Sequence, residues 1–475
     1  MNQISGECPY QGLASYPTAK ANYFFGRKDE QLTIIENLIA CPLTVLYGTC
    51  GVGKSSILNA GIVNHFLQKM NKLDNFLDQN NCIINGKFSV VLFDSWSSHE
   101  HPLKLLIQQM KKDISEQWSG TLDPLSFSSN SDFIQILEDC IKYLSNQSSC
   151  GELFIILDQF EDYFLYHPDE KKDGKQGTFF CEFPRAVEYA SEHTEIHFLV
   201  SLREDSLSKL DYFKQSLKCT KIHLDHLNLE MATEAIEEPI RVYNRSRVFD
   251  DEKIEIEKKL VEEVVKQLIT HTSSGFPRIE APHLQLVMER LWQEKDIQHT
   301  HRLGLDTLKR FESEKNTGVE NIIRESVSIL DKLSSLEQEI AAHLFDRLVI
   351  PSSSKGIPYT VSDLFEHVKH VQSPLLNKQQ LAEFLDKLSD RGWRILRSLD
   401  IPSRPDEKGY EIYHELLATP LRDWMRNRFD SMHHKKNLPS ISLDLRLFRS
   451  GYAALNGNTH GNKPLNLKLS KLEKP

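Results

Sequence analysis

The chain has 475 residues, 40% of them apolar and 26% charged, and a net charge of −10 at pH 7. This length predicts more than one domain, the composition suits buried hydrophobic cores, and the acidic balance argues against a surface that binds nucleic acid throughout. Eight scattered cysteines without a C-x-x-C pair, no signal-peptide pattern and no apolar run of membrane-spanning length favour a reduced, cytoplasmic protein that does not enter a membrane.

Residues 30–227 alternate between helical periodicity and short, continuous apolar runs, which are typical of strands buried on both faces. The predicted strands are Pro42–Tyr47, Phe88–Phe93, Leu153–Leu157, Ile196–Leu202 and Thr220–Leu224. Helices are predicted between them, including Ser55–Met70 and one that begins at Leu103. Strands that alternate with helices imply parallel pairing and right-handed crossovers. We therefore predict an α/β domain with a parallel sheet and helices on both faces.

The later part of the chain shows different patterns. Residues 228–328 carry helical periodicity and predict an all-α domain without strands. Residues 329–430 add a predicted β-hairpin, Arg394–Leu399 with Tyr410–Tyr413, behind amphipathic helices, which is the outline of a winged-helix-like domain. Residues 431–475 hold eight Lys/Arg against two acidic residues, which predicts a basic, poorly ordered tail.

The segment Gly48–Ser55 reads GTCGVGKS and matches the phosphate-binding pattern G-x-x-x-x-G-K-[ST]. Its glycines let the backbone curl so that several N–H groups point at phosphate oxygens, and the following helix adds its positive end. Lys54 can reach the β- and γ-phosphates, and the Ser55 hydroxyl can ligate Mg²⁺. The predicted nucleotide-binding residues are Gly48, Cys50, Gly51, Val52, Gly53, Lys54, Ser55 and Ser56.

Charged side chains follow two of the predicted strands. Asp158 comes directly after Leu153–Leu157, and it is expected to hold Mg²⁺ together with Ser55. Glu161 can orient or deprotonate the attacking water, or it can be a solvated residue at a helix start. Arg203, at the end of the fourth strand, can approach the γ-phosphate or form an ion pair with a neighbouring carboxylate (Glu204 or Asp205). Asp158, Glu161 and Arg203 are therefore the candidates for ATP hydrolysis.

Together these residues resemble the STAND class of P-loop ATPases, and most closely its novel STAND NTPase type 1 family, found mostly in multidomain bacterial regulators. Six short motifs follow the family's order over about residues 8–428. They are Cys8–Leu13 with Tyr23–Arg27, Asp158–Glu161, Leu202–Asp205, a helix-start motif at Glu238–Ile240, Pro282–Trp292, and Tyr410–Leu417 with Trp424.

The resemblance implies a nucleotide-dependent switch. In this class the NTPase and winged-helix parts close around ADP, a signal opens them, ATP replaces ADP, and the open form assembles into a homo-oligomer that activates an effector. It also implies that residues 1–29 approach the nucleotide, with Gly26 and Arg27 near adenine and ribose. His414 would approach the ADP phosphates; the alternative is a packed histidine that caps the hairpin. The expected cofactors are ATP or ADP with Mg²⁺, and the preference for adenine rests on the resemblance alone.

The chain also departs from the family's pattern. The motifs begin by residue 8, and only residues 431–475 follow the predicted winged helix, so we expect effector or sensor modules on other chains, or a shortened regulator. Leu416 replaces the alanine of the family's H-E-A-L motif, which can alter the packing under His414.

Three functions stay open at this point. The first is an ATP-driven signalling switch with slow hydrolysis. The second is an initiator- or loader-type ATPase on DNA, because such proteins also join a P-loop domain to a winged helix. The third is a nucleotide-dependent scaffold without turnover. Charge argues against the second, since residues 331–430 hold fourteen Lys/Arg and sixteen Asp/Glu, and the helix Leu381–Asp390 is acidic. Specific nucleic-acid binding is therefore not expected.

Overall fold

The computed structural model describes residues 8–71, 87–96, 101–118, 132–145, 151–170, 177–213, 218–245, 247, 249, 253–271, 277–294, 300–349, 358–369, 377–390, 393–401, 404 and 407–435. Contacts divide the chain after residue 425, so all of these except 426–435 belong to one compact unit. Among the helices of these residues, none combines the length and the apolar character that a membrane crossing requires.

Five parallel strands form the central sheet, in the order β2-β3-β4-β1-β5. All five predicted strands are thereby confirmed, and so is their parallel pairing. Because β1 lies between β4 and β5, the loop that follows β1 emerges beside the end of β4, with β3 one strand further along. The strands are β1 (Leu43–Gly48), β2 (Lys87–Phe93), β3 (Gly151–Leu157), β4 (Ile196–Arg203) and β5 (Thr220–His223).

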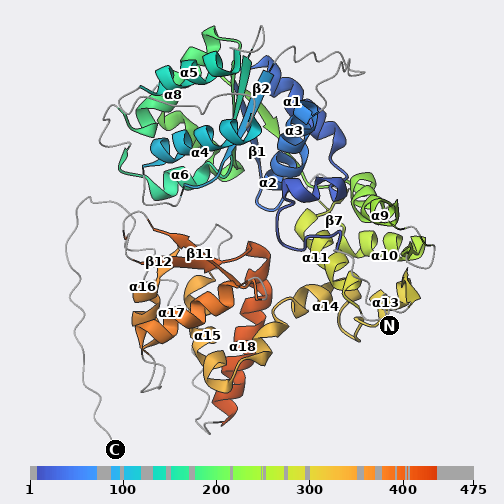
Figure 1. Ribbon diagram of the computed structural model, residues 1–475. Helices are drawn as coiled ribbons and strands as arrows, with labels where there is room; N and C mark the ends of the chain where they lie inside the picture. The colour runs from blue at the N-terminus through green and yellow to red at the C-terminus, as the bar shows by residue number, and fades with distance from the viewer. Residues whose placement is uncertain are drawn as a thin grey trace, which may run out of the picture. The chain divides into compact units, whose positions relative to one another are not determined.

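Helices cover both faces of this sheet (Figure 1). One face carries α4 (Pro102–Gln117), α5 (Phe133–Ser145), α6 (Glu161–Tyr166) and α8 (Phe179–Glu192); the other carries α1 (Lys28–Ala40) and α3 (Asn64–Asn71). Strand β3 shows the division, since Leu153, Ile155 and Leu157 belong to the first core while Phe154 and Ile156 belong to the second. Successive side chains of β3 point to opposite faces, and both faces are buried in apolar cores. The sequence of the strand is therefore a continuous apolar run.

The helix predicted after the phosphate-binding loop is present as a continuous helical run. It comprises α2 (Lys54–Ser56), a π-helical stretch η2 (Ile57–Val63) and α3. The apolar side of η2, including Ile57 and Ile62, packs into the core shared with α1. We call Lys54–Asn71 the phosphate-loop helix.

The next region is mainly helical, as predicted, but it is not free of strands. Two pairs of two-residue strands occur, β6 (Glu255–Ile256) with β9 (Arg302–Leu303) and β7 (Thr270–His271) with β8 (Pro277–Arg278). Segments this short leave no periodic signal, so the sequence analysis missed them. The helices are α9 (Leu229–Arg245), α10 (Lys258–Leu268), α11 (Ala281–Trp292), α13 (Leu305–Lys309) and α14 (Gly318–Glu325).

The expected helix start at Glu238–Ile240 is wrong, because these residues lie inside α9. Proline is disfavoured in a helix interior, since it has no N–H to donate. Here Pro239 lies on a buried apolar face with Ile236, Ile240 and Tyr243, and this packing carries the helix through the proline.

Three helices and a three-stranded antiparallel sheet follow, with the sheet order β10-β12-β11. We call Ser335–Leu417 the winged-helix-like region. Strands β11 and β12 confirm the predicted hairpin, whereas the two-residue β10 was not predicted. The last helix reaches Lys435, five residues into the predicted tail, and residues 436–475 lie outside the described part of the chain. The elements are α15 (Ser335–Leu348), β10 (Tyr359–Thr360), α16 (Val361–Val368), α17 (Lys378–Ser389), β11 (Leu396–Asp400), β12 (Lys408–Ile412) and α18 (Ala418–Lys435).

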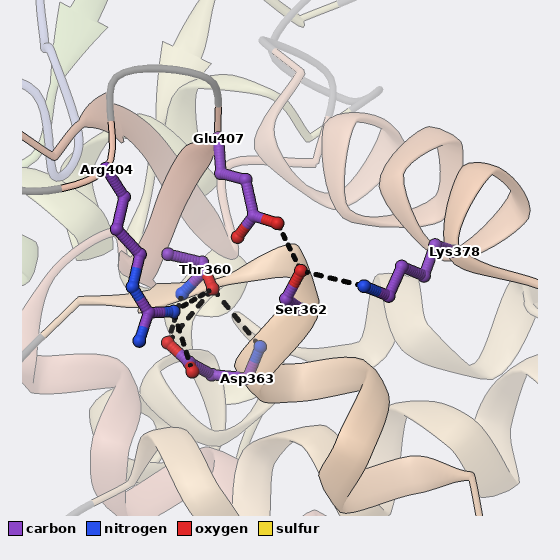
Figure 2. Close-up of polar contacts among 6 residues, drawn as sticks. All are labelled: Thr360, Ser362, Asp363, Lys378, Arg404 and Glu407. Carbon is purple, nitrogen blue, oxygen red and sulfur yellow. Dashed lines mark hydrogen bonds and ion pairs between the residues drawn. The ribbon is translucent and has the colours of Figure 1, made fainter.

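A polar network joins the β11–β12 connection to the start of α16 (Figure 2). The Thr360 hydroxyl caps α16 by accepting from the Asp363 N–H at 3.1 Å, and Arg404 donates to both of these side chains. Glu407 accepts from Ser362, whose hydroxyl also accepts from Lys378 at the start of α17. Burial acts to raise the pKa of Asp363, but Arg404 and Thr360 hold it below its usual range. The network fixes the hairpin connection on two helices.

Candidate nucleotide-binding site

The loop after β1 has the curled backbone that its sequence predicts. Gly51 and Gly53 have φ angles of 78° and 97°, in the left-handed region that favours glycine. A Cβ built on Gly53 has no atom within 4 Å, so the loop is open on that side at the N-terminus of the phosphate-loop helix. The Lys54 ammonium donates across the loop to the carbonyls of Gly48 and Thr49 at 2.9 and 3.0 Å. These are the features of a phosphate cradle.

Two acidic side chains lie close enough to Lys54 to affect its pKa. Burial lowers the pKa of Lys54, and the negative charge of Glu161 is the largest effect that opposes this, with Asp158 acting in the same direction. The lysine therefore lies between the loop carbonyls and the carboxylates that follow β3. Two of the predicted catalytic residues, Asp158 and Glu161, are thus brought to the loop.

Asp158 is held at the end of β3 by its neighbours on both sides. Its backbone N–H donates to Phe93 at 2.8 Å, and its carbonyl accepts from the buried indole N–H of Trp96 at 2.6 Å. The residue is 2% exposed. Burial raises the pKa of its carboxyl group, and the hydroxyls of Ser55 and Ser201 oppose that rise. A hydroxyl and a carboxyl oxygen side by side are the donors that Mg²⁺ takes in P-loop proteins, so Ser55 and Asp158 fit the ion.

Glu161 and Arg203 meet where β3 and β4 end. The Arg203 backbone N–H donates to Glu161 Oε2 at 3.2 Å, and Arg203 lies directly opposite Gly48 in the pairing of β4 with β1. Its guanidinium donates to Asp205 at 2.9 Å. Of the two ion pairs considered for Arg203, the structure therefore contains the one with Asp205.

Gly26 and Arg27 precede the loop in the sequence, and both pack against backbone carbonyls of other segments. Gly26 has a φ of 79° and contacts the backbone carbonyl of Met231, where a Cβ would collide. Arg27 is 3% exposed, and its guanidinium donates to the carbonyls of Val52 and Asp225 at 2.9 and 2.8 Å. A third bond goes to Glu30 at 2.7 Å. The Arg27 side chain thus positions the loop by hydrogen bonding to the loop's backbone.

His414 lies beside the phosphate-binding loop and also caps its own turn. A Cβ built on Gly51 would lie 3.8 Å from His414 Cε1 and 3.2 Å from Pro282 Cγ, at the start of α11. The His414 Nδ1 accepts from the Leu416 N–H at 3.2 Å, which leaves the other ring nitrogen as the donor. Burial, followed by the charges of His283 and Arg397, lowers the pKa of His414 to about 4. The imidazole is therefore neutral at pH 7.

A cavity of about 940 Å³ connects these groups. The N-terminal segment contributes to it through Gly12–Tyr16 and Tyr23–Phe25, and α11 through Pro282, His283 and Gln285. Gly26 and Gly48 are not on its wall, because each is packed against another part of the backbone. The predicted site residues that line it are Arg27, Cys50, Gly51, Val52, Gly53, Lys54, Ser55, Ser56, Asp158, Glu161, Arg203 and His414.

Sequence reasoning assigned no role to three residues that shape the site. Trp96 donates to the Asp158 carbonyl, Gln285 accepts from the N-terminal segment, and Pro282 contacts the loop at Gly51. Pro282 and Gln285 belong to a motif noted in the sequence, which was the only signal available. For Trp96 the signal was a large aromatic residue three positions after a predicted strand.

One family model covers the stretch of chain that holds these motifs. The family model described as Novel STAND NTPase 1 matches residues 9–442. Among solved structures, the Walker-type ATPase PABY2304 of Pyrococcus abyssi is 15% identical, with a TM-score of 0.40, covering 87% of this chain and 99% of its own. The Aeropyrum pernix ORC1 protein in complex with DNA is 11% identical, with a TM-score of 0.40, covering 85% and 93%. Drosophila ORC bound to DNA is 11% identical, with a TM-score of 0.35, covering 84% and 95%. The curated proteins contain no match.

Proposed function

The chain belongs to the Novel STAND NTPase 1 family, and on that premise we propose that it is an ATP- and ADP-binding molecular switch with slow ATP hydrolysis. The observation that carries this proposal is the convergence of the curled loop Gly48–Ser55, the carboxylates after β3 and His414 on one cavity. A residue of the winged-helix-like region beside the phosphate loop gives bound nucleotide a direct means of acting on that region.

The residues divide the work of binding and hydrolysis. The loop N–H groups and Lys54 bind the phosphates, and Ser55 with Asp158 would hold Mg²⁺. When bound, the ion neutralises charge on the phosphate oxygens. Glu161, held by the Arg203 N–H, orients the attacking water. Arg203 exchanges its partner Asp205 for the γ-phosphate when ATP is present.

His414 supplies the switch. In the ADP state the neutral imidazole and the start of α11 close over the loop at Gly51, where both already lie within contact distance of a built Cβ. Opening of this contact releases ADP, ATP enters, and the open form assembles into a homo-oligomer. Sensor or effector modules provide the input and the output of this cytoplasmic switch.

The charges disfavour the alternative of a DNA initiator or loader. Cations near the hairpin already pair within the region, Lys408 with Asp386 at 3.5 Å and Lys387 with Glu337 at 2.8 Å. Arg404 pairs with Asp363 at 2.9 Å. DNA phosphates would have to displace these carboxylates, and the electrostatic attraction that drives non-specific DNA binding would be reduced.

Titration with fluorescent ATP and ADP, with and without Mg²⁺, tests the proposal. We expect both nucleotides to bind the wild type, Asp158→Asn to lose the effect of Mg²⁺, and Lys54→Ala to lose binding. Lys28→Ala, an exposed lysine in the first turn of α1, is the matched control and should bind normally. Hydrolysis in the same samples separates the candidates. Slow turnover supports the switch, no turnover supports a scaffold, and many turnovers per minute support a loader.

A further inference from the structure

Residues 8–25, which we call the N-terminal strap, are fixed to the helical region at several points. Tyr10 is 1% exposed, donates to the Ile236 carbonyl of α9 at 2.7 Å and packs edge-on against Trp292. The Gln11 N–H donates to Gln285 Oε1 of α11 at 3.2 Å. Gly12 takes a φ of 59° and lies where a Cβ would collide with the Glu289 carboxylate. The strap is therefore anchored to α9 and α11.

The same strap is fixed to the phosphate-loop helix. The Tyr16 N–H donates to Ser56 Oγ at 3.1 Å, and the Thr18 hydroxyl donates to the Asn59 carbonyl at 3.4 Å. Ser56 follows Ser55, whose hydroxyl lies beside Asp158. This second set of bonds therefore ends at Ser56, which lines the cavity next to Ser55.

Tyr16 belongs to both sets of bonds. Its hydroxyl lies 2.8 Å from Gln285 Oε1 and 3.0 Å from the Pro9 carbonyl, two acceptors for its proton. The side chain is 4% exposed and its ring packs against Phe24. Burial raises the pKa of Tyr16 far above its usual range, so the hydroxyl keeps its proton and remains a donor. One residue thus connects Gln285 of α11 through its side chain to Ser56 through its backbone.

We infer that Tyr16 is a positioning residue that couples the helical region to the nucleotide site, with Gln285 as its receiver on α11. A shift of α11 reaches Ser56 through the Tyr16 hydroxyl and backbone, while Pro282 of the same helix lies beside Gly51, 3.2 Å from the position of a built Cβ. The phosphate-loop helix and α11 are thereby joined through one residue. The consequence for ADP release rests on the proposed nucleotide function, whereas the coupling itself does not.

Hydrogen exchange of the nucleotide-free full chain tests the coupling. Tyr16→Phe removes only the hydroxyl, and we expect amides in residues 54–66 to exchange about 3- to 10-fold faster, the factor for one lost hydrogen bond. Tyr10→Phe is the matched control, because it removes a buried hydroxyl of the same strap whose bond ends in α9. It should leave residues 54–66 unchanged. Unchanged exchange in Tyr16→Phe, or an equal rise in both variants, would overturn the inference.

Two further measurements complete the test. Gln285→Leu removes the acceptor of both the Tyr16 hydroxyl and the Gln11 N–H, so it should speed exchange at least as much as Tyr16→Phe does. The double variant should exchange more slowly than the product of the two single effects; fully additive effects would exclude the bond between them as the link. The wild type and both variants are then loaded with fluorescent ADP. Tyr16→Phe should release ADP about 3- to 10-fold faster than the wild type, and Tyr10→Phe should release it at the wild-type rate. If the wild type binds no ADP, the proposed function fails while the exchange data still decide the coupling.

Discussion

Arg27 donates from one guanidinium nitrogen to the carbonyls of Val52 and Asp225, which lie 25 and 198 positions further along the chain. At the scale of single residues the phosphate loop was predictable, because its motif is contiguous in the sequence and its glycines allow the left-handed backbone angles of the loop. The partners of Arg27 and Tyr16 were not, since backbone acceptors from distant segments leave no mark in composition or spacing. The resemblance implied that Arg27 lies near adenine and ribose, whereas its hydrogen bonds hold the loop backbone.

A substitution distinguishes these two roles of Arg27. Arg27→Lys keeps the charge but loses the planar fork, so it cannot replace both carbonyl bonds and the bond to Glu30. We expect the nucleotide-free protein to lose about 2 kcal/mol in free energy of unfolding, measured with urea. Glu30→Gln is the control and should lose less, since both carbonyl bonds stay. Unchanged stability combined with lost ADP binding would instead place Arg27 on the nucleotide.

At the scale of elements, the long strands and helices followed from periodicity because each buries a regular apolar face. The exceptions have physical reasons. Two-residue strands such as β10 are too short for a pattern, and Glu238–Ile240 lies inside α9 because packing outweighs the cost of Pro239. The network at the start of α16 was also invisible, since it joins Thr360 to Arg404 across 44 positions.

The capping hydroxyl of Thr360 gives a prediction for α16. Thr360→Val keeps the shape of the side chain but removes the acceptor for the Asp363 N–H and for Arg404 (Figure 2). We expect a cost of about 1 kcal/mol, seen as roughly fivefold faster amide exchange in Val361–Val368. Thr360→Ser keeps the hydroxyl and should exchange like the wild type. If valine and serine behave alike, the cap does not stabilise this helix.

At the scale of the whole molecule, the proposed switch depends on contacts within residues 8–425 between segments that are far apart in the sequence. Gly51, Pro282 and His414 come from the phosphate loop, α11 and the winged-helix-like region, yet they meet at one point. His414 was predicted at the phosphates only through a family resemblance, and that role stays a prediction; the structure places the ring beside the phosphate loop, with its Nδ1 accepting from the Leu416 N–H.

The pKa of His414 predicts how this arrangement responds to acid. Its value of about 4 in the folded, nucleotide-free protein lies below the unfolded value of about 6.5, so the unfolded or opened form binds protons more readily. The contribution of His414 is therefore complete above pH 6.5 and falls as pH drops toward 4. At pH 5.5 we expect a loss of about tenfold in the equilibrium constant for folding.

The measurement compares wild type with His414→Gln by urea unfolding across this pH range. The difference between the two proteins isolates His414 from other histidines with lowered pKa, such as His167 and His197. The wild type should lose stability more steeply between pH 6.5 and 4 than the variant. Parallel curves would show that His414 is solvated in the folded protein.

The most direct test of the central claim is the identity of the nucleotide that accompanies the purified protein. The protein is denatured and the released nucleotide is separated by ion-exchange chromatography, for the wild type, Lys54→Ala and His414→Ala. The account predicts bound ADP in the wild type, none in Lys54→Ala, and less in His414→Ala. Wild-type protein that arrives empty and turns over ATP many times per minute would contradict a closed ADP-bound switch.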